Sequence, residues 1–169
     1  MANISLLLFD RDGVLNQNPL DNGYVLSPSE LVIYPEVLNQ IAKLPKEIEI
    51  ACVTNQQCVG KKLLKPEDLC EINSVIAKSI LQAGGKKLEF FVCPHLATLN
   101  CDCRKPKPGL IFQAMNRFSK EPNETLFIGD KATDALAANA ANVKFTLTNS
   151  EVKTKEIINR FLTAKGINA

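Results

Sequence analysis

The chain has 169 residues, of which 46% are hydrophobic and 22% are charged, and its formal net charge is +2 at pH 7. These values are ordinary for a folded globular protein, and we expect one domain over residues 1–169. The small net charge argues against a nucleic acid as partner, and the sequence contains neither a run of roughly 20 apolar residues that could span a bilayer nor a signal peptide. We therefore expect a cytoplasmic protein without a membrane partner, and a monomer, because nothing in the sequence indicates a dimer face.

Strand-like and helix-like segments alternate along the chain. The first strand-like segment is the apolar run Leu6 to Phe9, and four more follow at residues 48–53, 88–92, 125–128 and 143–147. Apolar residues at helical spacing, often after a proline, predict helices over residues 35–44, 66–83, 108–118, 133–142 and 151–164. This alternation predicts an α/β fold: a three-layer, Rossmann-like parallel sheet with helices on both faces.

The connections between these segments are too short to hold a further cap domain. Residues 11–34 are rich in turn formers and polar residues, and they predict a long loop over the edge of the sheet. We expect a capless fold with an open site, whose specificity depends on residues 16–24, residues 57–62 and the loop that follows residue 92.

Two aspartates follow the first strand directly. Asp10 and Asp12 are separated only by Arg11, and carboxylates this close repel each other unless a cation or a shared proton relieves them. Mg²⁺ would do so, although a solvated Asp-Gly turn explains this stretch equally well by itself. Parallel strands share one carboxyl edge, so the pair can meet polar groups from elsewhere: Thr54, Asn55, Asp130, Arg104 and Lys105. This combination suits phosphoryl transfer, which requires positioning and charge neutralisation.

Half of the six cysteines lie close to the only histidine. Cys93, His95, Cys101 and Cys103 fall within eleven residues, and in a reducing compartment such a cluster favours metal binding over disulfides. Four ligands of this kind can enclose Zn²⁺ tetrahedrally and leave no open position, so the zinc would be structural. Unpaired loop thiols are the alternative. The remaining cysteines are expected to fill apolar positions: Cys52 in a strand, Cys70 in a helix and Cys58 beneath a loop.

Taken together, these motifs resemble those of the haloacid dehalogenase (HAD) superfamily of phosphatases. The resemblance is carried by residues 9–14 (FDRDGV), 54–56 (TNQ), 104–106 (RKP) and 129–134 (GDKATD), and it extends over about residues 6–148. Residues 93–106 (CPHLATLNCDCRKP) resemble the zinc-binding loop of one branch of subclass III. That branch includes D-glycero-D-manno-heptose 1,7-bisphosphate phosphatases and histidinol-phosphate phosphatases.

The resemblance implies a Mg²⁺-dependent phosphomonoester hydrolase that works through an aspartyl-phosphate. It implies that Asp10 is the nucleophile and that Asp12 protonates the leaving group and then activates water. Mg²⁺ would bind Asp10, the backbone carbonyl of Asp12, and Asp130. Asp134 would orient Asp130 or Lys131 rather than bind the metal.

The remaining site residues are also assigned by the resemblance. Thr54 and Lys105 would hold the oxygens of the transferred phosphoryl group. Asn55, Arg104 and Lys131 would contact the substrate. The zinc loop would hold its basic residues over the phosphate, because the last cysteine directly precedes Arg104.

The identity of the small-molecule phosphate ester stays open between two subfamilies. Residues 16, 23–25, 108–109 and 129–131 resemble the heptose bisphosphatases, whereas the spacing of the zinc ligands resembles the histidinol-phosphate phosphatases. The first set lies closer to the substrate, so a sugar bisphosphate is the preferred expectation. A polynucleotide 3′-phosphatase is disfavoured by the near-neutral charge and the lack of a basic-aromatic track. A non-catalytic zinc-loop or receiver-like module is disfavoured because it would not need Asp12.

Overall fold

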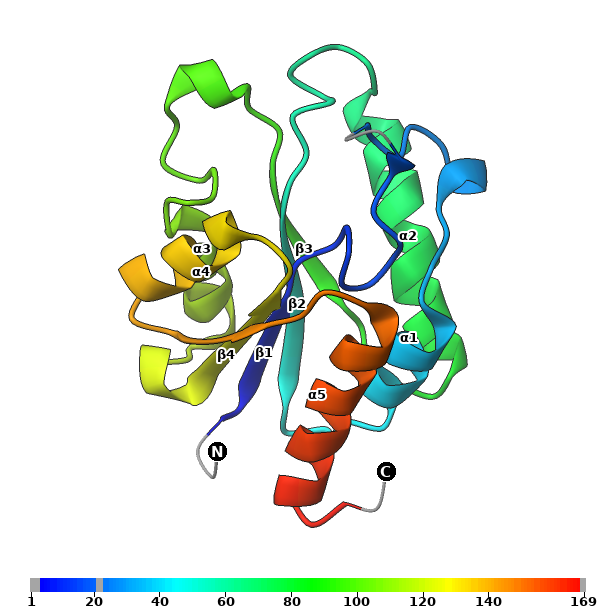
Figure 1. Ribbon diagram of the computed structural model, residues 1–169, viewed down its shortest axis with the longest axis vertical. Coiled ribbons are helices and arrows are strands. Elements are labelled where there is room, and N and C mark those ends of the chain that lie inside the picture. The colour runs from blue at the N-terminus through cyan, green and yellow to red at the C-terminus, as the bar shows by residue number, and fades with distance from the viewer. Residues whose placement is uncertain (1–3, 21–22, 168–169) are drawn as a thin grey trace.

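A parallel sheet forms the centre of the protein in this computed structural model, which describes residues 4–20 and 23–167 (Figure 1). Five strands lie in the order β3-β2-β1-β4-β5. Their bounds are Leu6–Phe9 for β1, Glu49–Asn55 for β2, Glu89–Cys93 for β3, Thr125–Gly129 for β4 and Lys144–Leu147 for β5. All neighbouring strands are parallel, which confirms the predicted α/β sheet.

Helices cover both faces of this sheet, as predicted. Their bounds are Pro35–Ala42 for α1, Pro66–Gln82 for α2, Gly109–Phe118 for α3, Ala132–Ala140 for α4 and Glu151–Ala164 for α5. In Figure 1, α1, α2 and α5 lie on one side of the sheet and α3 and α4 on the other. Strand β1 is buried on both faces: Leu7 and Phe9 pack toward the first group, and Leu6 and Leu8 toward the second.

Strands β2 and β3 both end later along the chain than the sequence predicts. Strand β2 continues to Asn55 and β3 continues to Cys93. Thr54 is therefore held in the sheet by the ladder between β2 and β3, and so is the first cysteine of the Cys/His cluster. Residues at the end of a hydrogen-bonded ladder are more rigid than loop residues, which favours precise placement of both groups.

The expectations for the three isolated cysteines have mixed outcomes. Cys52 and Cys58 are buried, as predicted, but Cys70 is exposed, so that prediction was wrong. The inner face of α2 is formed by Leu69 and residues three and four positions apart, and one step of about 100° along the helix turns Cys70 away from it. A polar residue, Asn73, takes an inner position instead.

The loops at the carboxyl edge of the sheet carry no additional folded layer within the described residues. Among the described residues between β1 and α1, a short 3₁₀ helix forms at Pro28–Glu30, and residues 56–65 contain only turns. The expected capless architecture is thus observed, and the carboxyl edge stays open to solvent. No described helix has the length and apolarity needed to cross a membrane.

Candidate active site

A buried lysine connects two acidic residues at the carboxyl edge of the sheet. Lys105 is only 3% exposed, and its Nζ lies 2.8 Å from Oδ1 of Asp10 and 2.7 Å from Oδ1 of Asp134. The same ammonium group donates to the carbonyl oxygen of Val53 at 2.9 Å. Asp10 is fixed in turn, because its backbone N–H donates to Ile128 O at 3.0 Å. Lys105 is therefore bound to the ends of β1 and β2 and to α4.

Burial sets the electrostatics of this group. It raises the pKa of Asp10 to about 6, against the opposing effect of Lys105 and with a further upward contribution from Asp134. Burial also opposes the charge on Lys105, but the two carboxylates outweigh it and raise the lysine pKa above its ordinary value. At neutral pH, Lys105 is thus positively charged and Asp10 is an anion that is stabilised less than it would be in water.

Asp134 orients the backbone at the start of α4. Its Oδ2 accepts hydrogen bonds from the backbone N–H groups of Asp130 at 3.2 Å and Lys131 at 3.0 Å, while its Oδ1 pairs with Lys105. Both carboxylate oxygens therefore have partners. This geometry agrees with the expectation that Asp134 orients its neighbours.

A divalent cation fits between Asp10 and Asp130. These two side chains and Asp134 offer oxygen atoms that lie within 4.8 Å of one another. Oδ2 of Asp130 accepts a hydrogen bond from Asn18 Nδ2 at 2.9 Å, whereas its Oδ1 is buried without a partner among the described residues. Mg²⁺ prefers such carboxylate oxygens and commonly binds through one or two of them. The residues present therefore fit the predicted Mg²⁺ site.

The carboxylate of Asp12 is bound by a separate group of donors. Arg11 donates to its Oδ1 from Nε at 3.1 Å and from Nη2 at 3.0 Å, and Asn16 adds a bond at 2.9 Å. Its Oδ2 accepts from Arg11 Nη2 at 3.1 Å and from Gln56 Nε2 at 2.9 Å. Arg11 is fully buried and also donates to Asn73 on α2 at 3.2 Å.

These contacts decide the charge of Asp12. Burial by itself would raise the pKa of its carboxyl group, but Arg11 and the hydrogen bonds from Asn16 and Gln56 together lower it. The Asp12 side chain is also outside the acidic group around Asp10. Its expected metal contact through the backbone carbonyl stays a prediction.

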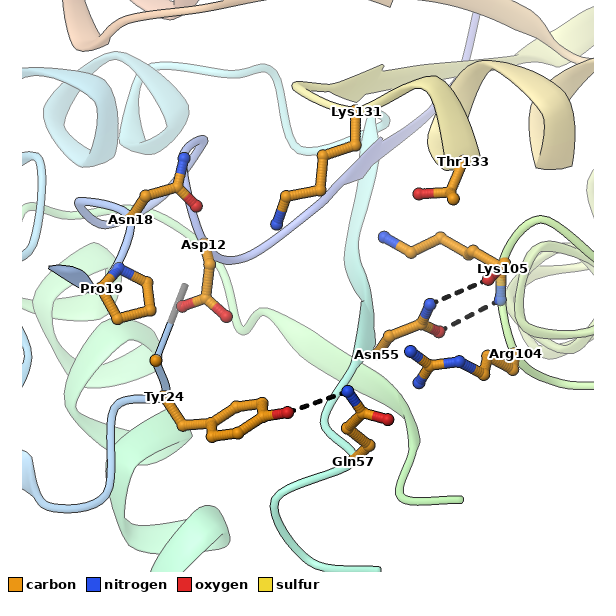
Figure 2. A pocket seen from close by; sticks show the side chains of 11 residues that line it. Asp12, Asn18, Pro19, Tyr24, Asn55, Gln57, Arg104, Lys105, Lys131 and Thr133 are labelled. Carbon is orange, nitrogen blue, oxygen red and sulfur yellow. Dashed lines mark hydrogen bonds between the residues drawn. The ribbon is translucent and has the colours of Figure 1, made fainter. Parts of the chain in front are cut away.

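Two residues of β2 connect the site to the loop that carries Lys105. Thr54 is buried, and its hydroxyl accepts a hydrogen bond from Gln56 Nε2 at 3.0 Å. Asn55 donates to Lys105 O at 3.0 Å and accepts from Lys105 N at 3.1 Å (Figure 2). Because both bonds go to the backbone, Asn55 fixes the position of Lys105 as well as lining the pocket.

The pocket above these residues has a volume of about 470 Å³. In Figure 2, Lys105, Asn55 and Arg104 lie on one side of it, and Asn18 and Tyr24 lie on the opposite side. All three regions that were expected to set specificity contribute to the lining, namely residues 16–24, residues 57–62 and the loop after β3, and Lys131 and Thr133 at the start of α4 contribute as well. A smaller cavity of about 40 Å³ is lined by Asp10, Thr54, Lys131 and neighbouring residues. The predicted catalytic and substrate-binding residues are therefore together at one edge of the sheet.

The predicted zinc ligands converge in the loop after β3. Sγ of Cys93 lies 3.6 Å from Nδ1 of His95 and 3.6 Å from Sγ of Cys101, and Sγ of Cys103 lies 3.2 Å from the histidine nitrogen and 3.5 Å from Cys101. Tetrahedral zinc with Zn–S bonds near 2.3 Å places its sulfur ligands about 3.8 Å apart, so these residues fit Zn²⁺ closely.

The chemistry of the cluster also favours a cation. Burial, then the hydrogen bonds with Cys93 and Cys101, and then the repulsion between neighbouring thiolates raise the pKa of Cys103 to about 12. A bound cation removes this repulsion. Arg104 follows the last cysteine, and its guanidinium approaches His95 O at 3.5 Å, so the metal loop and the basic residues form one continuous unit.

The sequence-based predictions assign no individual contact at the site to five polar residues: Arg11, Asn16, Asn18, Gln56 and Asn73. Arg11 and Gln56 stand inside recognised motifs, where a charged or amide residue beside a catalytic one is a usable signal. The contacts of Asn18 and Asn73 depend on loop and helix positions that no sequence pattern specifies.

Replacing Asn18 tests the proposed Mg²⁺ site. Asn18→Ala removes the donor that holds Oδ2 of Asp130, and we expect Mg²⁺ affinity to fall about 10-fold, the lower end of typical effects for groups that orient metal ligands. Isothermal titration of Mg²⁺ into the protein measures this directly. Gln17→Ala, at the exposed neighbouring position, should leave the affinity unchanged. Equal affinity in Asn18→Ala and wild type would contradict the role of Asn18 in orienting Asp130 for the metal.

Comparison with known proteins agrees with this geometry. A family model described as HAD-hydrolase-like matches residues 102–166. The D-glycero-β-D-manno-heptose-1,7-bisphosphate 7-phosphatase of Neisseria meningitidis serogroup A is 34% identical over 154 residues, which cover 89% of this chain and 81% of that protein. The bifunctional histidine biosynthesis protein of Buchnera aphidicola is 31% identical over 135 residues, covering 79% of this chain but 38% of that protein.

A solved structure is similar over nearly the whole chain. The D,D-heptose 1,7-bisphosphate phosphatase of Bordetella bronchiseptica, crystallised with magnesium and phosphate, matches with a TM-score of 0.85 and 26% identity. The match covers 95% of this chain and 99% of that chain. Both the sheet and the loops at its carboxyl edge are therefore part of a shared architecture.

Proposed function

Because this chain belongs to the HAD-like phosphatases, in the family of the D-glycero-D-manno-heptose 1,7-bisphosphate phosphatases, we propose that it removes the 7-phosphate of a heptose 1,7-bisphosphate. The observation that carries the proposal is the 34% identity with a 7-phosphatase over 89% of the chain. The convergence of Asp10, Asp12, Thr54, Lys105 and Asp130 at one edge of the sheet supports it.

The first half of the reaction transfers the phosphoryl group to the protein. A carboxylate oxygen of Asp10 attacks phosphorus, and the bond between phosphorus and the sugar oxygen breaks as Asp12 donates a proton to that oxygen. Thr54 and Lys105 hold the phosphoryl oxygens. Mg²⁺, bound by Asp10 and Asp130, would neutralise negative charge on the phosphoryl group.

The second half releases phosphate. Asp12, now a carboxylate, takes a proton from water, and the water oxygen attacks phosphorus so that the bond to Asp10 breaks. The lowered pKa of Asp12 keeps it a carboxylate in the free protein, and the base role requires that ionised form. Its acid role needs a proton on Asp12 before the transfer, and a negatively charged phosphate beside the carboxyl group favours that protonation because like charges raise its pKa.

The charge of the pocket supports a substrate with two phosphates. Lys105 is neutralised by Asp10 and Asp134. Arg104 and Lys131 line the larger pocket, Lys131 also lines the smaller cavity, and neither is ion-paired with a described acidic residue. We assign the contact with the second phosphate to these cations, since arginine and lysine both bind phosphate through charge-assisted hydrogen bonds.

The same charges disfavour histidinol phosphate. That substrate carries an ammonium group, which needs an acidic or carbonyl partner away from the phosphate. Asp12 is the only acidic residue among the described residues that line the larger pocket, and Arg11 already neutralises it. An ammonium group would instead meet Arg104 and Lys131.

Turnover of three esters tests the proposal. We expect kcat/KM for heptose 1,7-bisphosphate to exceed that for the 7-monophosphate and for histidinol phosphate by at least about 10-fold, the effect of losing one good charged contact. Arg104→Met should reduce the advantage of the bisphosphate over the monophosphate. Faster hydrolysis of histidinol phosphate would overturn the substrate assignment and leave the phosphatase assignment intact.

A further inference from the structure

One buried amide side chain contacts two of the residues that act in the proposed reaction. Gln56 is 1% exposed, and its Nε2 donates to Oδ2 of Asp12 at 2.9 Å and to Oγ1 of Thr54 at 3.0 Å. Its Oε1 faces the thiol of Cys58 at 3.7 Å. Because an ionised carboxylate only accepts hydrogen bonds, the amide must turn its NH₂ group toward Asp12.

The bond to Thr54 directs the proton of that hydroxyl. A threonine hydroxyl has a single proton and two acceptor lone pairs. Since Oγ1 accepts from Gln56, its own proton is left for an acceptor in the small cavity that Thr54 and Asp10 line. A phosphoryl oxygen is such an acceptor, so Gln56 prepares Thr54 to donate to it.

The hydrogen bond from Gln56 to Asp12 holds this carboxylate on the side that faces Thr54, where the phosphate would bind. Arg11 binds both oxygens of that carboxylate through its buried guanidinium, and Asn16 binds Oδ1. Gln56 supplies the contact with Oδ2 that connects Asp12 to β2. Without it, Asp12 would be held only by residues 11 and 16, which belong to its own loop.

We propose that Gln56 is a positioning residue, which sets the distance between the proton donor Asp12 and the phosphate-binding hydroxyl of Thr54 by donating to both. The inference rests on the proposed phosphatase reaction. It predicts that Gln56 affects most strongly the esters whose leaving oxygen must be protonated. An ester that releases a stable anion needs the correct phosphate position but little help from Asp12.

The test compares two leaving groups in Gln56→Met, which keeps the bulk of the side chain and removes its donor. A sugar alkoxide needs a proton, whereas p-nitrophenolate leaves without one. We expect kcat for heptose 1,7-bisphosphate to fall about 100-fold, the lower range for general acid catalysis, and kcat for p-nitrophenyl phosphate to fall less than about 10-fold. Inorganic phosphate should also bind more weakly in the presence of Mg²⁺, as measured by isothermal titration.

Two further variants make the result specific. Gln56→Glu keeps the shape of the side chain but replaces the donor to Asp12 with a second carboxylate. It should lower the ratio of kcat for heptose 1,7-bisphosphate to kcat for p-nitrophenyl phosphate at least as far as Gln56→Met does. Gln40→Met replaces another buried glutamine, on α1 and outside the pocket, and should leave the ratio and the phosphate affinity as in wild type. Circular dichroism checks that each variant is folded.

The outcomes separate this inference from the proposed function. An unchanged ratio of kcat values in a folded Gln56→Met protein would overturn the positioning role and leave the phosphatase assignment standing. A wild-type protein that hydrolyses neither ester would refute the proposed function. In that case the affinity for inorganic phosphate alone would test whether Gln56 prepares Thr54 to bind phosphate. Equal affinity in Gln56→Met and wild type would overturn that role as well.

Discussion

Asp10→Asn is expected to lower Mg²⁺-dependent phosphatase activity by a factor of about 10⁴ or more, as is typical for loss of a nucleophile. An amide is a poor nucleophile toward phosphorus and cannot form an aspartyl-phosphate. The substitution also removes one of the carboxylates that offer oxygen atoms to a cation. The effect should therefore appear in kcat with every phosphate ester, whatever its leaving group.

The same substitution should not destabilise the metal-free protein at neutral pH. Burial raises the pKa of Asp10 from 3.8 to about 6, so the folded protein binds a proton there more tightly than the unfolded chain does. This group therefore favours folding below about pH 4, and its contribution is lost as the pH rises through 6. The uncharged amide of the Asp10→Asn variant avoids burying a charge. We expect a gain of between zero and about 3 kcal/mol at pH 7, because the altered contact with Lys105 offsets part of it.

Activity and thermal unfolding, each with EDTA and with Mg²⁺, measure both effects. Wild type should be stabilised by Mg²⁺ more than Asp10→Asn is, and the difference in metal-free stability should shrink as the pH falls toward 4. Asp68→Asn, which removes an exposed carboxylate in the first turn of α2, is the control for net charge. Full activity in Asp10→Asn would exclude this residue as nucleophile.

Loss of zinc is expected to have the second large effect. Cys101→Ser replaces a ligand in the cluster of Cys93, His95, Cys101 and Cys103, and we expect metal affinity to fall by at least about 100-fold and the activity with it. The loop has little apolar core of its own, so its order depends on the metal. Its far end carries Lys105, which contacts Asp10, and a loosened loop would release that contact.

Elemental analysis, activity and thermal unfolding test this prediction. Wild type should contain about one zinc per chain, and Cys101→Ser should contain much less, unfold at a lower temperature and hydrolyse phosphate esters slowly. Cys70→Ser is the matched control, because Cys70 is exposed on α2 and outside the cluster. A wild-type protein without zinc, or a Cys101→Ser protein with full activity, would contradict the structural role of the metal.

The sequence predicts the sheet and its helices well, because buried strands and amphipathic helices leave strong periodic patterns. The sequence also predicts that Asp10, Thr54 and Asp130 converge, because the strand ends of one parallel sheet share an edge. The contact between Arg11 and Asn73 does not follow, because it depends on which residue of α2 faces the loop after β1. The prediction that Cys70 is buried was wrong for a related reason, because a residue type that is usually buried lies at a helix position that faces solvent.

The loop from β3 to α3 is fixed at separate points along its length. Cys93 belongs to the sheet, the Cys/His cluster draws the middle together, and Lys105 is held by Asn55 and by buried ion pairs. Few conformations remain to be lost when a phosphate binds there, so binding should cost little conformational entropy on this side of the pocket. The opposite side, around Asn18 and Tyr24, belongs to the separate loop after β1, where the hydroxyl of Tyr24 accepts a hydrogen bond from Gln57. The affinity for phosphate would then depend on the side formed by the loop from β3 to α3, and the selectivity for the alcohol would depend on the side around Asn18 and Tyr24. The two properties would be thermodynamically separate.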